Sequence, residues 1–291
     1  MLSHYQNANG KKITEGVYTL NEFLTAAAQP VANPANADAM TSWIEGNQWG
    51  WMGLDGEHKP GENHFTATAR LCREGYRKGV DLMAKVADKI TAPTPKTVRR
   101  YQRWQEHGDD VEMQRIWAGS LDNAWRGTHR DTRHGPQRVR ILIDAIESGG
   151  NGADGMRWRG VAALKLSDLL TEAGYSVQVE SVISCKDSSS DRLFKLRTIV
   201  KEYEQPLDVL TLAATTCLPA FFRSLMHTWG LAVAVNNRYG VSYQVRTPDA
   251  GEFPDGDESC KVFVIPGKMN DAEKASACIT DIIETLDKAG E

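Results

Sequence analysis

"ILIDAIESGGNGADGMRWRGVAALKLSDLLTEAGYSVQVE", residues 141–180, decides the predicted fold of this chain. It opens with an apolar run that ends in a carboxylate, Asp144, and continues through a Ser/Gly loop. An amphipathic helical pattern follows, in which Val161, Leu164, Leu166, Leu169 and Leu170 are predicted to pack on the sheet. A second run rich in β-formers closes the stretch. A strand, a helix and a strand in this order predict an α/β protein.

The alternation continues through the rest of residues 137–291. Further β runs are predicted at residues 207–216, 231–237 and 260–267, and helices at residues 191–205, 219–230 and 271–290. Residues 139–145, 207–213 and 262–265 are almost continuously apolar, as expected when helices cover both faces of a sheet. We therefore expect a doubly wound, mostly parallel sheet, with residues 139–145 central and parallel to residues 207–213.

Residues 1–136 have a different texture. Short helices are predicted at residues 19–29 and 65–90, and residues 41–65 form a loop rich in Trp and Gly. The sequence thus predicts two domains: a helical, Trp-rich amino-terminal region, residues 1–136, and an α/β domain, residues 137–291.

The composition is that of an ordinary globular protein, with 41% hydrophobic residues, 25% charged residues and a net charge of -4. No apolar run approaches the roughly 18 residues of a membrane-spanning helix, and no secretion signal is recognised. The five cysteines are scattered without a CxxC pair, which supports neither a zinc site nor a disulfide framework. We expect a cytoplasmic protein with no membrane partner.

The loop after residues 139–145 is where a doubly wound sheet binds its ligands. Its pattern, Asp144-Ala-Ile146-Glu-Ser148, resembles the Asp-x-Ser-x-Ser metal site of the von Willebrand factor A domain, over about half of the chain. The resemblance implies Mg²⁺ ligands at Asp144, Ser148 and Thr215. Ile146 replaces one oxygen ligand, so any Mg²⁺ would be held weakly, and no cofactor is expected. The alternative is that Asp144 caps the loop or the following helix.

No complete catalytic constellation is visible in the sequence. GxSxG and HExxH are absent, and the glycine-rich residues 148–155 match neither GxGxxG nor GK[ST]. His227 lies among apolar residues at helical spacing, which favours a core histidine. Enzymatic activity is therefore not the first interpretation.

Two groups of residues are candidates for binding. Aromatic side chains gather in the loop at residues 41–65 and at the start of the helix after Asp144. These candidates are Trp43, Trp49, Trp51, Trp158 and Arg159. A basic segment, residues 96–140, could bind nucleic-acid phosphates. Neighbouring acidic residues reduce its positive charge, and the alternative is a connector between the domains whose arginines pair with these acids. Its candidate residues are Arg126, Arg130, Arg133, Arg138 and Arg140.

A second resemblance covers nearly the whole chain. The segments "NEFLTAAAQP", "SWIEGNQWGW", "ARLCREGYRKG" and "WRGVAALKLSDLLTEAGYSVQVES" look like an uncharacterised family of tailed-bacteriophage proteins. The resemblance implies a phage-encoded protein in the host cytoplasm or the virion, and no activity. We expect a protein-binding module that acts on a phage or host partner. The alternatives are a nucleic-acid-associated protein using residues 96–140, a metal or nucleotide ligand at the Asp144 loop, and a structural virion component.

Overall fold

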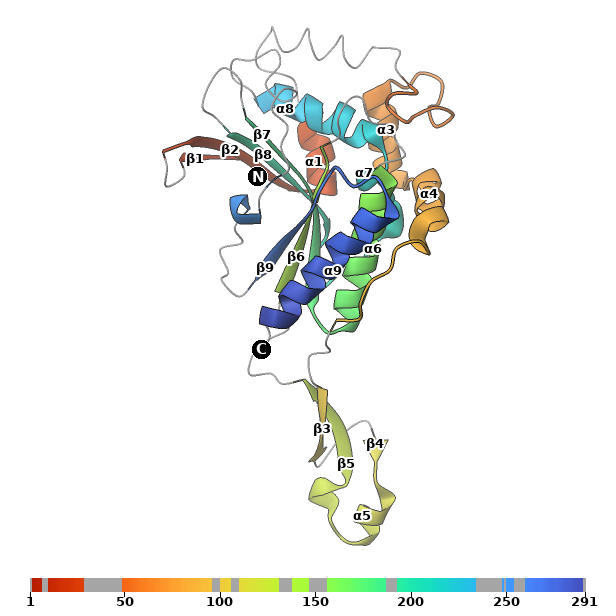
Figure 1. Ribbon diagram of the computed structural model, residues 1–291, viewed down its shortest axis with the longest axis vertical. Coiled ribbons are helices and arrows are strands. Elements are labelled where there is room, and N and C mark those ends of the chain that lie inside the picture. The colour runs from red at the N-terminus through yellow and green to blue at the C-terminus, as the bar shows by residue number, and fades with distance from the viewer. Residues whose placement is uncertain are drawn as a thin grey trace.

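The computed structural model in Figure 1 contains a six-stranded sheet packed against helices and a separate three-stranded sheet. It describes residues 2–6, 10–28, 49–95, 100–105, 110–130, 138–146, 156–186, 193–233, 248, 250–253 and 260–289. The strands of the large sheet are β1 Leu2–Gln6, β2 Lys12–Thr19, β6 Arg138–Asp144, β7 Ser176–Lys186, β8 Leu193–Lys201 and β9 Lys261–Ile265. The helices around it are α1 Leu20–Ala27, α3 His64–Glu74, α4 Arg77–Ala87, α6 Met156–Glu172, α7 Val209–Thr216, the π-helix η3 Phe221–Met226, α8 His227–Val233, the 3₁₀ turn η4 Ala250–Glu252 and α9 Ala272–Ala289.

The large sheet is mixed, with the strand order β1-β2-β8-β7-β6-β9. The pairs β2–β8, β7–β6 and β6–β9 are parallel, whereas β1–β2 and β7–β8 are antiparallel. The protein is therefore a mixed α/β protein with a mostly parallel sheet. β6 lies between β7 and the edge strand β9, so residues 139–144 are inside the sheet, as predicted, but not at its centre.

Three predicted elements of the α/β region are wrong. Residues 207–213, predicted as a strand parallel to β6, belong mostly to α7, whose amino terminus is capped by the Asp208 carboxylate accepting from the Leu210 amide. Residues 191–205, predicted as a helix, contain β8. In β8 the residues alternate between the two sheet faces, which gives Lys195 and Arg197 a common side. The strand predicted at residues 231–237 is also wrong where it can be seen, because residues 231–233 lie in α8.

The description of residues 1–136 as helical needs correction as well. β1 and β2 belong to the large sheet, because β2 pairs with β8 from Ile13↔Leu193 to Thr19↔Ile199. The two predicted regions thus share one sheet. Their predicted boundary, between residues 136 and 137, lies outside the described residues.

The helices predicted before residue 91 are present, with one interruption. Thr19 and Glu22 form a capping box at the start of α1, whose Phe23 and Leu24 are buried. The helix predicted at residues 65–90 is two helices, α3 and α4, separated at Gly75. Gly75 has a φ of 93°, and a Cβ there would lie 2.8 Å from the Leu210 side chain. Glycine therefore permits both the turn and the close approach of α7.

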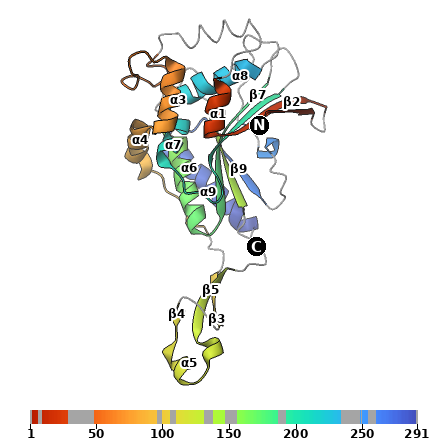
Figure 2. The ribbon, with the colours of Figure 1, turned by 180° about the vertical axis from the view of Figure 1, so that it is seen from behind.

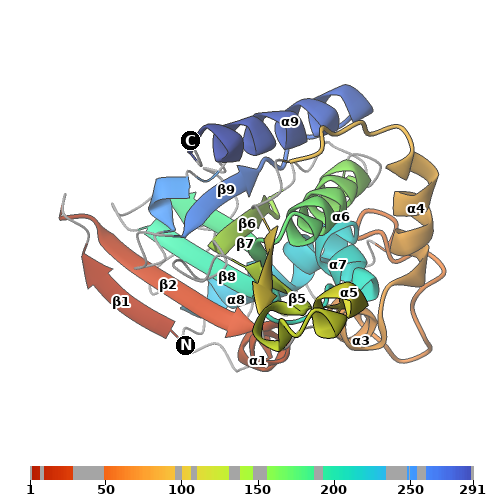
Figure 3. The same cartoon turned by 90° about the horizontal axis from the view of Figure 1, so that it is seen from below.

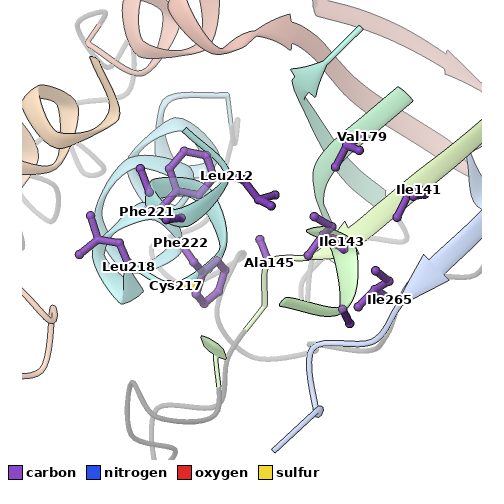
Figure 4. Close-up of a cluster of buried hydrophobic side chains, with 14 of the residues drawn as sticks. Ile141, Ile143, Ala145, Val179, Leu212, Cys217, Leu218, Phe221, Phe222 and Ile265 are labelled. Atoms are coloured by element: carbon purple, nitrogen blue, oxygen red, sulfur yellow. The ribbon is translucent and has the colours of Figure 1, made fainter. Parts of the chain in front are cut away.

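The main hydrophobic core lies between one face of the sheet and the helices. Figure 4 shows side chains of β6, β7 and β9 on one side of this core and those of α7 and η3 on the other. A much smaller cluster, Leu142, Val182 and Phe253, lies on the opposite face of the sheet. There the short blue helix η4 lies beside β9, away from α6 (Figures 1 and 3). We call this opposite side the second face.

The separate sheet forms an arm at one end of the molecule (Figures 1 and 2). Its strand order is β3-β5-β4 and both pairs are antiparallel. The arm contains β3 Arg100–Gln105, β4 Asp110–Val111, α5 Met113–Trp117, the 3₁₀ turn η1 Leu121–Asn123 and β5 Trp125–Arg130. The arm was not predicted from the sequence.

Within the described residues, no single helix has the length and apolarity needed to cross a membrane. One pair of helices reaches that composition only together, Val209–Thr216 with Phe221–Gly230, and it is bent by 64°.

Candidate functional site

Asp144 lies at the carboxyl end of β6, at the position predicted for a metal ligand. Its side chain is buried, and both of its oxygens accept hydrogen bonds from backbone amides. Oδ1 accepts from the Ile146 amide at 3.1 Å, and Oδ2 accepts from the Gly267 amide at 3.2 Å. A Cβ added to Gly267 would lie 2.4 Å from the Ile146 carbonyl oxygen. The loop after β9 is thus packed directly onto the Asp144 carboxylate.

Arg159, on α6, forms hydrogen bonds at the junction where the end of β6 meets the end of α7. The side chain is fully buried, and its guanidinium donates to backbone carbonyls of two separate segments. Nε donates to Thr216 O at 3.1 Å; Nη1 donates to Asp144 O at 2.9 Å and to Ile146 O at 3.3 Å; Nη2 donates to Ala145 O at 3.3 Å. Arg159 therefore ties the end of β6 to the end of α7, and this cation disfavours a divalent ion nearby.

The other predicted metal ligands are not brought to Asp144 by the described structure. Thr215 lies in α7, and its hydroxyl donates to the carbonyls of Thr211 and Leu212 within its own helix, at 3.0 and 3.1 Å. Ser148 lies outside the described residues. Within the ranges that the structure describes, no three His, Cys, Asp or Glu residues are grouped as a metal site would require.

We predict that magnesium does not stabilise the fold, because backbone amides already engage both Asp144 oxygens. Thermal unfolding should give the same midpoint in millimolar Mg²⁺ and in excess chelator. Asp144→Ala should lower the unfolding free energy by about 2 to 4 kcal/mol in both buffers, since two buried amides lose their acceptor. A midpoint that rises with Mg²⁺ in the native protein, and no longer does so in Asp144→Ala, would instead establish a working metal site.

Burial makes three reactive groups poor catalysts, and two of them, Cys185 and Cys217, lie near Asp144 or Arg159. Desolvation, with the nearby Asp144 charge, raises the pKa of the Cys185 thiol to about 12. Desolvation raises the pKa of the Cys217 thiol to about 11. His227, at the start of α8, has its pKa lowered to about 4 by burial. At neutral pH the thiols are protonated and His227 is uncharged, so none is poised as a nucleophile or a general acid.

The predicted aromatic binding residues are largely engaged within the protein. The Trp49 ring stacks on His58 at 4.2 Å and meets the edge of His64 at 4.4 Å. The Trp51 ring lies 4.2 Å from the Arg223 guanidinium, which also donates to the Trp51 carbonyl. Trp158 is only 8% exposed. Trp43 lies outside the described residues.

The predicted nucleic-acid residues do not form one exposed stripe in the described structure. Arg140 is fully buried beside Glu180, with 3.6 Å between Nε and Oε1. Arg138 lies over the Tyr203 ring at 5.2 Å. Arg126 and Arg130 occupy β5 of the arm, 8 or more residues before β6, and the structure describes only their backbone. Arg133 lies outside the described residues.

A family model described as a domain of unknown function (DUF7192) matches residues 19–289. The chain belongs to the DUF7192 family. The match extends from the end of β2 to α9, so it includes the arm and spans both regions predicted from the sequence. Comparisons with curated proteins and with solved structures found no significant match.

The most exposed large hydrophobic side chain among the described residues of this DUF7192 chain lies in the arm, at a residue that was not among the predicted binding residues. Trp117 is 78% exposed and Met113 is 45% exposed, on successive turns of α5. Trp117 was visible in the sequence only as one of three tryptophans among charges at residues 100–130. Trp117 differs from Trp104 and Trp125 because it lies on a short helix, whereas they lie in β-strands. This difference can be seen only once the arm is known.

Proposed function

We propose that this DUF7192 chain is a protein-binding module that contacts its partner through the tip of the arm. The observation that carries the proposal is the exposure of Trp117, 78%, beside Met113 on α5. Large aromatic side chains and methionine are enriched at protein interfaces, and a tryptophan buried in a partner's pocket can dominate the binding energy. The partner we propose is a protein with an apolar pocket that accepts the indole.

Main-chain hydrogen bonds fix the helix that carries these two side chains. The Glu112 amide donates to Ala124 O at 2.8 Å, which ties the start of α5 to the residue before β5. At the other end the Ser120 amide donates to Arg115 O at 2.9 Å, and Gly119 adopts a φ of 81°. A side chain presented on an ordered turn loses less conformational entropy on binding. This favours recognition by a preformed surface.

The charge of the arm favours a protein over a nucleic acid. Residues 100–130 contain equal numbers of arginines and acidic residues, so the arm is formally neutral. These are Arg100, Arg103, Arg115, Arg126 and Arg130 against Glu106, Asp109, Asp110, Glu112 and Asp122. Nucleic-acid binding depends on an excess of positive charge that displaces counterions.

We predict that any affinity for nucleic acid is weak and sensitive to salt. Electrophoretic mobility shifts should show binding at about 50 mM salt that is lost by about 200 mM, as expected for few phosphate contacts. Retention of a tight complex at the higher salt concentration would replace the protein-binding proposal with the nucleic-acid alternative.

The proposed class of partner and the proposed location rest on a sequence resemblance. The likeness to tailed-bacteriophage proteins is the reason to propose a phage or host protein as the partner, in the host cytoplasm or as part of the virion. The von Willebrand A resemblance stays a prediction: β6 and its parallel neighbours fit it, whereas the antiparallel β7–β8 pair and helix α7 depart from it.

The proposal is tested by comparing partners recovered from infected cells with the native protein and with Trp117→Ala. We expect one protein to be recovered with the native chain and to fall at least about tenfold with Trp117→Ala, as for a binding hot spot. Lys268→Ala, another exposed position, is the matched control and should recover that protein in full. Equal recovery by all three proteins, or recovery of nucleic acid alone, would contradict the proposal.

A further inference from the structure

The second face of the sheet is unusually polar for the interior of an α/β protein. A row of charged side chains crosses it from β6 to β2, and Tyr5 of β1 extends the row. Glu180 is fully buried and receives two hydrogen bonds from Arg197, both at 2.8 Å, while Arg140 lies on its other side. Arg197 also approaches Glu15 at 3.8 Å, and the Tyr5 hydroxyl donates to Glu15 at 2.7 Å. Buried charges are costly unless they are paired, so this arrangement fixes where each side chain points.

One short segment of the chain, Glu252 and Phe253, is bound to this face by four kinds of contact. The Glu252 carboxylate accepts from the Ser184 hydroxyl at 2.8 Å. Lys195 donates to the Glu252 carbonyl, and Arg140 donates to the Phe253 carbonyl. The Phe253 ring is fully buried in the small cluster with Leu142 and Val182, and Lys195 lies 5.2 Å from the ring centre.

Contacts of these kinds can also hold a separate peptide segment. Two cations hold successive main-chain carbonyls and a hydroxyl holds an acidic side chain. An aromatic ring packs in an apolar cluster with a cation over the ring. Arg140 and Lys195 come from different strands, and Ser184 is the direct partner of Lys195 across the β7–β8 pair. The donors thus belong to the rigid sheet, whereas the segment they hold has a single 3₁₀ turn, closed by the Phe253 amide and Ala250 O.

We propose that the second face is a binding site for a peptide segment in which an acidic residue precedes an aromatic one. In the structure the chain's own Glu252 and Phe253 occupy it. A partner segment of the same chemistry would compete with them, so the protein's own segment acts as a built-in inhibitor of this site. This site is separate from the arm and goes beyond the function proposed for Trp117.

Because the chain's own segment competes for the site, the affinity of the protein for an external peptide depends on how strongly that segment is held. An external peptide binds only the fraction of molecules in which Glu252 and Phe253 have left the site, and its apparent dissociation constant rises as that fraction falls. Phe253→Ala removes the buried ring and keeps the face intact. It should therefore bind an external peptide at least about tenfold more tightly than the native protein.

The test uses a labelled peptide with the sequence of residues 248–254, PDAGEFP, and the full chain. Binding is followed by fluorescence anisotropy with the native protein and Phe253→Ala. Peptides with Gln in place of Glu, or Ala in place of Phe, should bind Phe253→Ala several-fold more weakly. Ser184→Ala combined with Phe253→Ala should lose the preference for Glu over Gln while still binding the aromatic residue. Trp117→Ala should not alter peptide binding, so the result is independent of the arm.

A second variant covers the case in which Phe253→Ala does not fold. Glu252→Gln keeps the shape of the segment and weakens its contact with Ser184, so the native peptide should bind it more tightly than the native protein. The proposal is overturned if a folded variant binds the peptide no better than the native protein does. It is also overturned if the Gln and Ala peptides bind as well as PDAGEFP, which would indicate attraction without recognition.

Discussion

Arg159→Ala is expected to be among the most damaging single substitutions in this protein. The side chain is fully buried, and its removal leaves the carbonyls of Asp144, Ala145, Ile146 and Thr216 without these hydrogen bonds. Each buried acceptor that loses its partner costs about 1 to 3 kcal/mol, so the unfolding free energy should fall by at least about 3 kcal/mol. Urea unfolding followed by circular dichroism measures this directly.

Two controls separate the role of Arg159 from that of a general positive charge. Arg73→Ala, at an exposed position near the end of α3, should change the unfolding free energy by less than about 0.5 kcal/mol. Arg159→Lys keeps the charge but not the planar fork, and should recover only part of the loss. An Arg159→Ala protein as stable as Arg73→Ala would show that the junction of β6, α6 and α7 does not depend on this guanidinium.

Replacing Trp229 should destabilise the protein strongly, whereas replacing Trp117 should not. Trp229 is 1% exposed and packs α8 against β2. The indole is so close to Gly16 that a Cβ added to this glycine would lie 2.5 Å from the ring. The indole Nε1 donates to the Tyr18 hydroxyl at 3.4 Å. Trp229→Ala should therefore lower the unfolding free energy by about 3 to 5 kcal/mol. Trp117→Ala, at the exposed tip of the arm, should leave it within about 0.5 kcal/mol.

Chemical unfolding of the two variants side by side provides the comparison. The result also bears on domain organisation, because Trp229 joins a strand near the amino terminus to the carboxy-terminal half. Equal unfolding free energies for Trp229→Ala and Trp117→Ala would mean that the packing of α8 on β2 contributes little to stability. The shared sheet would then not be a single cooperative unit.

The sequence predicted β6, α6, β9 and α9 well because each has a clear period and clear ends. Gly174, with a φ of 98°, ends α6 as expected for a left-handed cap. Two neighbouring segments, β8 and α7, illustrate why other elements were predicted wrongly. α7 is apolar on all sides because it is buried in the core, and a short apolar run of this kind does not distinguish helix from strand.

β8 was mistaken for a helix because its charged residues resemble the solvent face of one. Lys195 and Arg197 instead point to the second face, where Lys195 donates to the Glu252 carbonyl and Arg197 to the Glu180 carboxylate. The alternation of these residues with Phe194 and Leu196 was a strand signal that the charges concealed. A buried ionic network of this type is a tertiary property and has no local sequence signature.

The candidate sites show the same division between local and tertiary information. The position of Asp144 at a strand end followed from the sequence, and so did the suspicion that it serves the loop. Its second partner did not, because Gly267 is 123 residues away in the chain. Trp117 was one tryptophan among several until the arm placed it at an exposed turn, whereas Trp49, Trp51 and Trp158 proved to be packed against the protein.

Photocrosslinking in cells infected with the proposed phage would show whether the arm tip is a protein-binding surface. A benzophenone amino acid is placed at Trp117 and, as the control, at Glu284, an exposed position on α9. We predict that position 117 gives a discrete crosslinked protein that position 284 does not, and that excess native protein suppresses it. Crosslinks of equal yield and pattern from both positions, or none at 117, would contradict the account.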